Sequence, residues 1–287
     1  MHKQTEALID YPKSSIERPP IDCVVALEEG YKIPAKINGN EVLFIFDTGA
    51  DAPAFVSRRF AEQHHVKIFK QTIPTEGVVA TEQTNIGFID SLQIGNIVYR
   101  NFWALVFPNN RISYNDVVIT EVDAVLGRHF MDLIGEIQIY STENKILFPF
   151  QPSTLAKEKN IFLQNGQPYI EVLLNKSQIP LHLDTGGGIA LYSNYFQENK
   201  EWIKKKGLKD TLGIAGVGGA QHYPIYTIPS MELVITDVPT TIENIPVFTD
   251  IQGFSNESYG MIGMDILSRF YKVILNFKDM YLKIERL

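Results

Sequence analysis

The chain carries the same short motif twice, each time in the same setting. Asp47-Thr48-Gly49 ends an apolar, strand-like run over residues 42–46, and Asp184-Thr185-Gly186 ends another over residues 179–183. Both copies are followed by small residues. One triplet could be a plain turn, because Asp and Gly both favour turns. Two copies with matching flanks instead indicate two similar half-sites, each of which supplies one carboxylate.

A second pair of markers supports an internal duplication. Gly127 closes an apolar-apolar-Gly step 80 residues after Asp47, and Gly263 closes another 79 residues after Asp184. Each step precedes a short amphipathic stretch and then an alternating apolar/polar hairpin pattern. Repeated order at a fixed spacing constrains architecture more than any single motif. The two hairpins are expected over residues 137–148 and 272–284.

Most apolar runs are short, rich in β-branched or aromatic residues, and bounded by Gly, Asn, Asp or Pro, which is typical of strands. Helical periodicity is confined to short segments, of which the best are Ser57–His65 and Ser193–Lys206. The 287 residues, 45% of them hydrophobic, suffice for two compact units. The expected fold is mainly β, with two similar β-barrel-like lobes and an active-site cleft between them.

The chain divides into four expected parts. Residues 1–20 are polar, end in Pro19-Pro20, and are read as an N-terminal extension. Turn-rich sequence from Pro149, followed by charged residues, indicates a linker. The boundaries are 1–20 for the extension, 21–150 for the N-terminal lobe, 151–160 for the linker and 161–287 for the C-terminal lobe.

Composition argues against several classes of function. A net charge of −7 with no basic stripe argues against a nucleic-acid partner. A single cysteine, Cys23, excludes an intrachain disulfide and a multi-thiolate metal site, and the six histidines show no metal-ligand spacing. We therefore expect no metal and no cofactor. No apolar run approaches the ~20 residues of a membrane span.

The sequence leaves the cellular compartment open. The first six residues, from Met1 to Glu6, lack the apolar segment of a signal peptide. The chain as written is therefore expected in the cytoplasm. A chain from which a signal had been removed would be periplasmic or secreted.

The repeated triplet suits a particular chemistry. Glycine two residues after each aspartate permits a tight turn that aims backbone N–H groups at the carboxylate. The hydroxyls of Thr48 and Thr185 can bond across a two-fold axis to the opposite loop. Loops meeting head to head would bring Asp47 and Asp184 within hydrogen-bond range, where like charges share one proton. One carboxyl can then deprotonate water while the other protonates a substrate oxygen, as peptide hydrolysis requires.

These residues resemble those of pepsin/retropepsin-type aspartic peptidases. The segment from Phe46 to Asp51 is similar to the active-site loop of retroviral proteases, and Gly127 and Gly263 resemble the glycine segment behind that loop. The resemblance covers residues 31–287 and is strongest to bacterial retropepsin-like proteases, here with two fused lobes. It implies an acid-protease fold and an aspartic endopeptidase. Its catalytic pair would be Asp47 and Asp184, with Thr48, Gly49, Thr185 and Gly186 as loop support.

The family resemblance also implies a hairpin, or flap, that closes over the substrate. Glycine density between the two markers of each half gives two candidates: Gly77, Val78 and Val79 in the first, and Gly216, Val217, Gly218 and Gly219 in the second. Neither candidate carries a flap tyrosine like that of pepsins. A plain surface hairpin remains the alternative for the second segment.

The expected partner is a peptide or protein substrate, and the expected active unit is one chain, because each half supplies one carboxylate. Two other functions remain open. The duplicated fold could be a catalytically silent peptide-binding protein. Actin-like ATPases and sugar kinases also carry two Asp-x-Gly loops that hold phosphates, but their folds interleave long helices with the strands.

Overall fold

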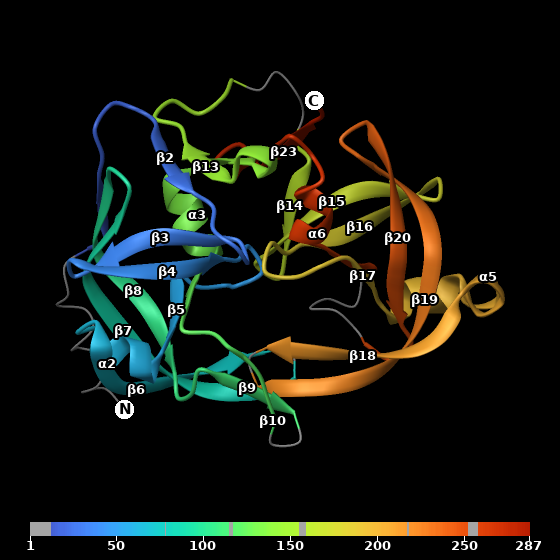
Figure 1. Ribbon diagram of the computed structural model, residues 1–287, viewed down its shortest axis with the longest axis horizontal. Helices are drawn as coiled ribbons and strands as arrows, with labels where there is room; N and C mark the ends of the chain where they lie inside the picture. Colours follow the sequence, from blue (N-terminus) through green and yellow to red (C-terminus); the bar gives the residue numbers. More distant parts are fainter. Residues whose placement is uncertain (1–12, 78, 115–116, 155–158, 217, 252–257) are drawn as a thin grey trace.

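The computed structural model describes residues 13–77, 79–114, 117–154, 159–216, 218–251 and 258–287. The chain forms two β lobes that stand side by side, with a third sheet above the line where they meet (Figure 1). The mainly β, two-lobed fold expected from the sequence is confirmed. None of the described helices is long and apolar enough to span a membrane.

The first lobe is built on a closed ring of six strands. The ring runs β8-β5-β11-β4-β3-β7 and closes through the β7–β8 pairing, while β1 and β6 extend it outside β8 and β7. The elements are β1 (Ser15–Glu17), β3 (Lys32–Ile37), β4 (Asn40–Phe46), β5 (Ala54–Ser57), α2 (Arg58–Gln63), β6 (Lys67–Glu76), β7 (Thr81–Ile94), β8 (Ile97–Phe107), β9 (Arg111–Tyr114), β10 (Val117–Glu121), β11 (Ala124–Leu126) and α3 (Arg128–Ile134).

The second lobe repeats this ring strand for strand. Its order is β20-β17-β21-β16-β15-β19, closed through the β19–β20 pairing. The elements are β14 (Ile161–Gln164), β15 (Gln167–Leu174), β16 (Ser177–Leu183), β17 (Ala190–Leu191), α4 (Ser193–Glu198), α5 (Lys200–Lys206), β18 (Leu208–Gly216), β19 (Gly219–Ile235), β20 (Val238–Phe248), β21 (Gly260–Ile262) and α6 (Met264–Leu267). The duplication read from the sequence is therefore a duplication of topology.

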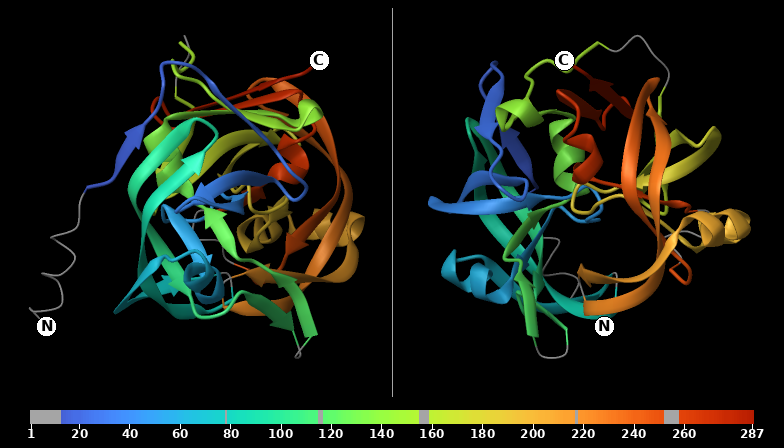
Figure 2. Two further views of the ribbon diagram at one scale, coloured as in Figure 1. Left: turned by 60° about the vertical axis from the view of Figure 1, so that its left-hand side comes forward. Right: turned by 45° about the vertical axis from the view of Figure 1, so that its right-hand side comes forward.

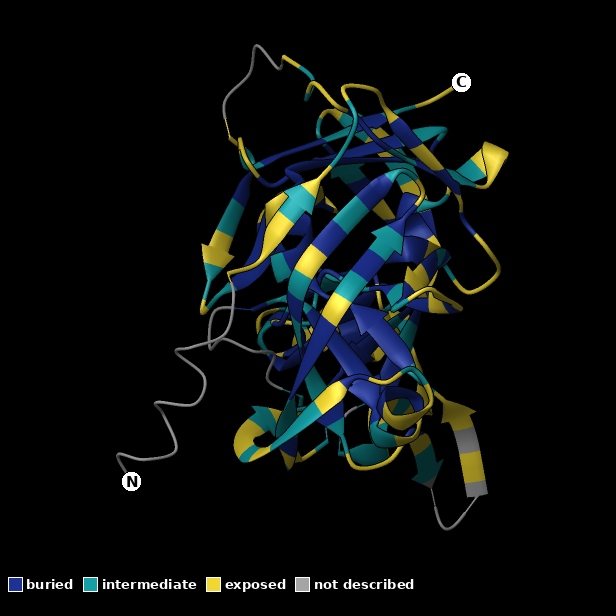
Figure 3. Cartoon of the chain, turned by 90° about the vertical axis from the view of Figure 1, so that its left-hand side faces the viewer, coloured by how far each residue is buried: buried dark blue, intermediate teal, exposed yellow. Residues whose placement is uncertain are grey.

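Local sequence explains why these strands form where they do. In β4, Val42, Phe44 and Phe46 are buried while the residues between them are not, which is the period-two pattern of a half-buried strand. The β3–β4 turn places Asn38 at φ +49° and Gly39 at φ +87°, a left-handed pair that suits a two-residue hairpin. Figure 3 shows the same alternation of buried and exposed residues along several strands.

The N-terminal extension expected over residues 1–20 contains a strand. Ser15–Glu17 forms β1, which pairs antiparallel with β8 from Ser15 opposite Arg100 to Glu17 opposite Val98. The edge of β8 offered unpaired backbone groups that this polar segment could satisfy. The segment was too short and too polar to be recognised as a strand by its pattern.

A five-stranded sheet joins the lobes. Its order is β2-β13-β12-β22-β23, so the two expected hairpins lie side by side with β12 of the first half paired to β22 of the second. The elements are β2 (Cys23–Ala26), β12 (Glu136–Tyr140), the 3-10 turn η1 (Ser141–Glu143), β13 (Lys145–Phe148), β22 (Lys272–Asn276) and β23 (Tyr281–Glu285). One continuous apolar core runs from the first ring through this sheet into the second.

A buried polar network crosses the middle of this sheet. The carboxyl group of Glu136 accepts hydrogen bonds from Gln138 Nε2 (2.6 Å), from Ser153 Oγ (2.8 Å) and N (2.8 Å), and from Asn276 Nδ2 (2.9 Å). Glu136 and Asn276 are both fully buried, and they face each other across the β12–β22 pair. The network therefore ties the first half of the chain to the second.

We expect Glu136→Gln to lower the free energy of unfolding by about 3 kcal/mol, because the amide would turn a donor toward donors in place of a charge-assisted acceptor. Denaturant unfolding measures the change. Glu62→Gln, the same change at an exposed position of α2, is the control and should leave the unfolding midpoint unchanged. Equal midpoints for the two variants would contradict this account of the joint between the lobes.

Candidate active site

Each aspartate of the repeated triplet begins a loop at the end of a central strand. Asp47 follows β4 and donates its backbone N–H to Leu126 O (3.0 Å), and Asp184 follows β16 and donates its N–H to Ile262 O (3.0 Å). In both lobes the acceptor lies on the parallel neighbour strand, β11 or β21. The same ladder bond therefore fixes the start of both loops.

The two loops interlock through their threonines. Thr48 Oγ1 accepts from Thr185 N (3.0 Å) and donates to Leu183 O (2.6 Å). Thr185 Oγ1 accepts from Thr48 N (2.9 Å) and donates to Phe46 O (2.9 Å). Both threonines are buried, so these four bonds satisfy groups that water cannot reach. The loops meet head to head as the sequence predicted.

The glycine of each triplet packs against the carboxyl group of the other loop. A methyl group on Gly49 would lie 2.7 Å from Asp184 Cγ, and one on Gly186 would lie 2.5 Å from Asp47 Cγ. Each glycine also donates its N–H to the aspartate of its own loop, at 2.8 Å for Asp47 and 2.9 Å for Asp184. Only glycine leaves room for the two carboxyl groups to approach each other.

The pKa values of both carboxyl groups are raised. Burial, and then the charge of Asp184, raise the pKa of Asp47 well above its usual value. Burial also raises the pKa of Asp184, against the hydrogen bonds donated by Asp47 and by the N–H groups of Gly186 and Gly187. Two carboxyl groups this close cannot readily both ionise, so the pair shares one proton.

The two downstream glycines hold the loops from behind. A methyl group on Gly127 would lie 2.2 Å from Ala52 O, and one on Gly263 would lie 1.9 Å from Gly187 O. The residue after each glycine donates its N–H to the loop: Arg128 N to Ala50 O (2.8 Å) and Met264 N to Gly187 O (3.2 Å). The repeated sequence spacing therefore separates each aspartate loop from the glycine segment that packs behind it.

Beyond these shared contacts, different charged side chains contact the loop in each lobe. In the first lobe, Asp51 accepts from Arg128 Nη2 at 2.9 Å and lies 2.9 Å from His129 Nε2. In the second lobe, the carboxyl group of Asp265 accepts from Ile189 N. Sequence reasoning missed these pairs, because residues 51 and 128 become neighbours only through the loop-to-glycine contact.

An apolar wall flanks each loop. In the first lobe, apolar residues gather next to Ala50. In the second lobe, Met261 lies beside Gly187: a methyl group added to Gly187 would lie 2.2 Å from the terminal methyl of Met261. The first-lobe wall is Ile45, Ala50, Ala52, Phe55, Leu105, Phe107, Val122 and Val125. The second-lobe wall is Ala190, Tyr192, Ile214, Tyr223, Ile225, Phe248, Ile251 and Met261. Both walls are separate from the main core. Each reaches the loop that carries the aspartate of its lobe, at Ala50 in the first and at Gly187 in the second.

A pocket of about 480 Å³ adjoins the first loop. Its lining includes Asp51, Ala52 and His129 together with Ile73, Ile86 and Trp103. It therefore combines apolar side chains with a carboxyl group and an imidazole. Among the described residues, no three His, Cys, Asp or Glu side chains gather closely enough to hold a metal ion.

Both flap candidates lie at the tips of long hairpins. Gly77 and Val79 lie between β6 and β7, where Gly77 N donates to Ala80 O (3.1 Å), and Gly216, Gly218 and Gly219 lie at the β18–β19 turn. Val78 and Val217 lie outside the described residues. A methyl group on Gly218 would lie 2.4 Å from Ala80 N, so the two tips touch. Figures 1 and 2 show the hairpins approaching from opposite lobes.

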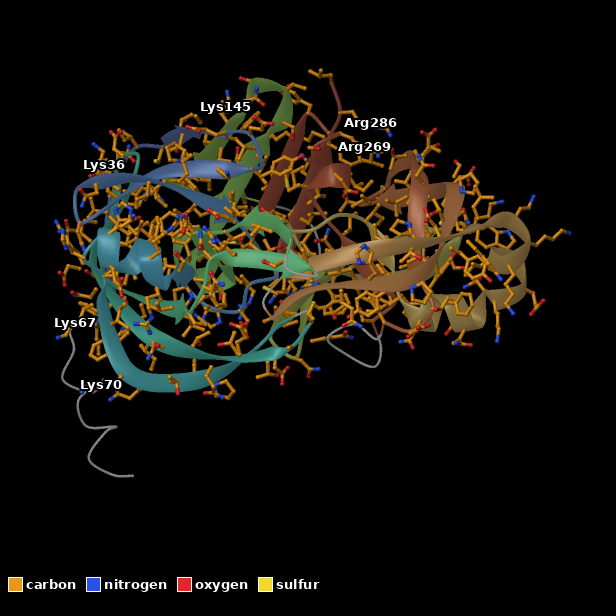
Figure 4. All side chains as sticks on the ribbon, turned by 60° about the horizontal axis from the view of Figure 1, so that its bottom comes forward. Lys36, Lys67, Lys70, Lys145, Arg269 and Arg286 are labelled. Atoms are coloured by element: carbon orange, nitrogen blue, oxygen red, sulfur yellow. The ribbon has the colours of Figure 1, made fainter. Side chains whose placement is uncertain are left out.

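A third hairpin joins the other two, and the sequence analysis did not anticipate it. The β9–β10 pair of the first lobe lies against β18 and β19 of the second. Two arginines stabilise the base of this hairpin. Arg111 Nε donates to Glu121 Oε1 (3.0 Å), and Arg59 Nη2 donates to Asp123 Oδ2 (2.7 Å). Figure 4, seen from the hairpin side, shows the labelled Lys67 and Lys70 of β6 at the outer edge, away from the second lobe.

Comparison with known proteins agrees with this geometry. Residues 33–130 match the family model described as aspartyl protease, a span that includes the first triplet, the first hairpin and Gly127. The match confirms the resemblance to aspartic peptidases, supports that activity and implies a peptide substrate. No curated protein matches the chain.

Among solved structures, the chain is similar to a retropepsin-like aspartic protease from Rickettsia conorii. The two are 16% identical, with 47% of this chain and 94% of that chain covered and a TM-score of 0.31.

We expect Gly218→Ala to push the two tips apart. Its new methyl group would meet the backbone of Ala80, whereas one on Gly219 would meet nothing within 4 Å. Both glycines have positive φ, at +89° and +114°, so the backbone strain is shared and Gly219→Ala is the matched control. Hydrogen exchange of residues 70–85, in the other lobe, should accelerate in Gly218→Ala only. Equal exchange in both variants would show that the tip contact does not hold the hairpins together.

Proposed function

We propose that the protein is an aspartic endopeptidase in which Asp47 and Asp184 activate a water molecule against a peptide bond. The observation that carries the proposal is the meeting of the two aspartate loops, which are interlocked by their threonines so that the glycine of each loop packs against the carboxyl group of the other. Two carboxyls that share one proton supply an acid and a base at a single point.

The acid and base roles divide between the two carboxyl groups. The charged member of the pair takes a proton from the water, whose oxygen attacks the peptide carbonyl carbon, and the protonated member gives its proton to the carbonyl oxygen. The first member then returns its proton to the nitrogen as the C–N bond breaks, and the second recovers its proton as the carbonyl reforms. The pair ends as it began, so neither a metal nor a covalent intermediate is required.

The surroundings of the pair favour an extended peptide with apolar side chains beside the cleaved bond. The two apolar walls flank the loops, and burying one aliphatic or aromatic side chain contributes about 1.5–3 kcal/mol. The hairpin tips, which include Gly77, Val79, Gly216, Gly218 and Gly219, would form the cover. Such a cover must open to admit substrate, and glycines allow the backbone to move.

The rival functions differ in their fit to the fold. The described helices are no longer than seven residues, whereas actin-like and sugar-kinase folds interleave long helices with strands. A silent peptide-binding protein would share the whole fold. The retained carboxyl pair favours the enzyme, because burying two carboxyls together destabilises a protein that does not use them.

We expect Asp47→Asn and Asp184→Asn each to lower kcat by at least about 10³-fold, because either change removes the shared proton. The double variant should be no worse than the singles. Peptide-library digestion followed by mass spectrometry across pH measures this, with Asp90→Asn, exposed on β7, as control. Hydrolysis by either single variant at the wild-type rate would end the assignment. No hydrolysis by the wild type at any pH would favour the silent binder.

The same variants have a stability signature. Because the folded carboxyls have raised pKa values, their contribution to stability is present below the unfolded pKa and lost as pH rises through the folded pKa. Asn variants should therefore melt at or above the wild-type temperature at neutral pH, so lost activity in them is not lost folding.

We also expect one chain to be the active unit, since both loops of the site come from the same polypeptide. Specific activity should stay constant on dilution to nanomolar enzyme. A fall in activity that coincides with dissociation of a dimer in sedimentation would contradict this.

A further inference from the structure

The pocket beside the first aspartate loop is lined both by that loop and by the first flap hairpin. Asp51, four residues after Asp47, lines it from the loop. Ile73 of β6 and Ile86 of β7 line it from the two arms of the hairpin, and Trp103 of β8 adds an indole. A peptide held between the loop and the hairpin could therefore place one side chain in this pocket.

The indole of Trp103 is held by two other rings. Phe88 lies opposite Trp103 in the β7–β8 pair and meets it edge to face, with ring centroids 5.0 Å apart. Phe69 of β6 lies 5.8 Å from it, tilted by 33°. Trp103 is itself only partly buried, so it presents a ring of fixed orientation to the pocket.

The second lobe does not repeat this lining. Val106 in β8 and Val247 in β20 hold matching places, because each pairs in parallel with the short strand that follows the aspartate loop of its lobe. Three residues before these valines stand Trp103 in the first lobe and exposed Asn244 in the second.

Two further places in the lining change in the same way. The residue on the neighbouring strand, opposite the position just before the matched valine, is Ile86 in the first lobe and Thr227 in the second. Four residues after the aspartate, Asp51 has Gly188 as its counterpart. At these places the second lobe has polar side chains or none, so the aromatic lining is particular to the first.

The carboxyl group in the pocket is already engaged. Asp51 Oδ1 accepts from Arg128 Nη2 and lies 2.9 Å from His129 Nε2. Because the guanidinium balances its charge, this carboxyl group does not make the pocket a site for a lysine or arginine side chain.

We propose that this pocket selects an aromatic side chain of the substrate, at one fixed position relative to the cleaved bond, by packing it against Trp103. The proposal rests on the proposed peptidase function and names its substrate class: peptides with phenylalanine, tyrosine or tryptophan at that position. Two aromatic rings that pack edge to face or offset gain more than the apolar area they bury. Ile73 and Ile86 add apolar contact beside the indole.

The first arm of the test measures specificity. When wild type digests a peptide library, we expect aromatic residues to be enriched at a single position relative to the cut. Trp103→Ala should lower kcat/KM about tenfold for the best aromatic peptide and less than about twofold for the same peptide with alanine there. Trp202→Ala, at an exposed tryptophan on α5 of the second lobe, is the control and should change neither value.

A second variant guards against a general loss of structure, since Trp103 also packs against Phe69 and Phe88. Ile86→Thr introduces the second-lobe residue and keeps a β-branched side chain on the strand. We expect about a threefold loss for the aromatic peptide only, because part of the apolar contact is removed. Its melting temperature should stay close to that of the wild type.

The third arm is independent of catalysis. The chain has two tryptophans, so in Asp47→Asn combined with Trp202→Phe the fluorescence comes from Trp103 alone. It is titrated with an alanine–serine peptide that carries one phenylalanine, and with the same peptide carrying alanine there. We expect the phenylalanine peptide to shift the emission to shorter wavelength and to bind about tenfold more tightly.

The outcomes separate the two proposals. Cleavage without an aromatic preference, or a preference that both Trp103→Ala and Ile86→Thr retain, would overturn the role of the pocket while leaving the peptidase intact. Failure of the wild type to cut any peptide would reject the peptidase. The fluorescence arm would then still decide whether the pocket takes an aromatic side chain, and emission that the phenylalanine peptide leaves unchanged would show that it does not.

Discussion

The rest of the structure depends on the reciprocal hydrogen bonds of Thr48 and Thr185. Two carboxyl groups repel each other when both are charged and lose hydration when buried, so nothing about them favours their meeting. Buried hydroxyls that each satisfy a backbone N–H of the other loop supply the attraction. Once the loops are locked, only glycine fits at positions 49 and 186, and the carboxyls must share a proton.

That lock also explains the sheet between the lobes. Four hydrogen bonds at the loops cannot resist rotation of two large barrels, so a second, broader joint is needed. The β12–β22 pair supplies it, with buried Glu136 and Asn276 opposite each other at one end of the pair. The continuous core through this sheet makes the lobes one folding unit, which keeps the loops in register.

The features that could be predicted from the sequence are those encoded in local pattern. The triplets, the two downstream glycines and the hairpins over 137–148 and 272–284 repeat along the chain, and the structure places each as expected. The pairs Asp51 with Arg128 and Gln167 with His182 carry no such signal, because the first forms where the loop meets the downstream glycine and the second depends on the register of the β15–β16 pair. Among the described residues between β20 and β21 of the second lobe there is no hairpin that corresponds to β9–β10, so the repeat gave no signal for it.

His182 shows the limit of reading by symmetry. The repeat directs attention to what the two halves share, so residues that differ between the halves, such as Ile45 and His182, escape it. In a dimer of identical chains the two half-sites carry the same residues, so the chain itself cannot distinguish the carboxyls. A single chain with two copies is free to keep Ile45 on one side and a buried imidazole on the other. Because both lobes belong to one chain, different residues can stand beside the two carboxyl groups. The reciprocal threonine hydrogen bonds nevertheless keep the geometry of the two loops symmetric.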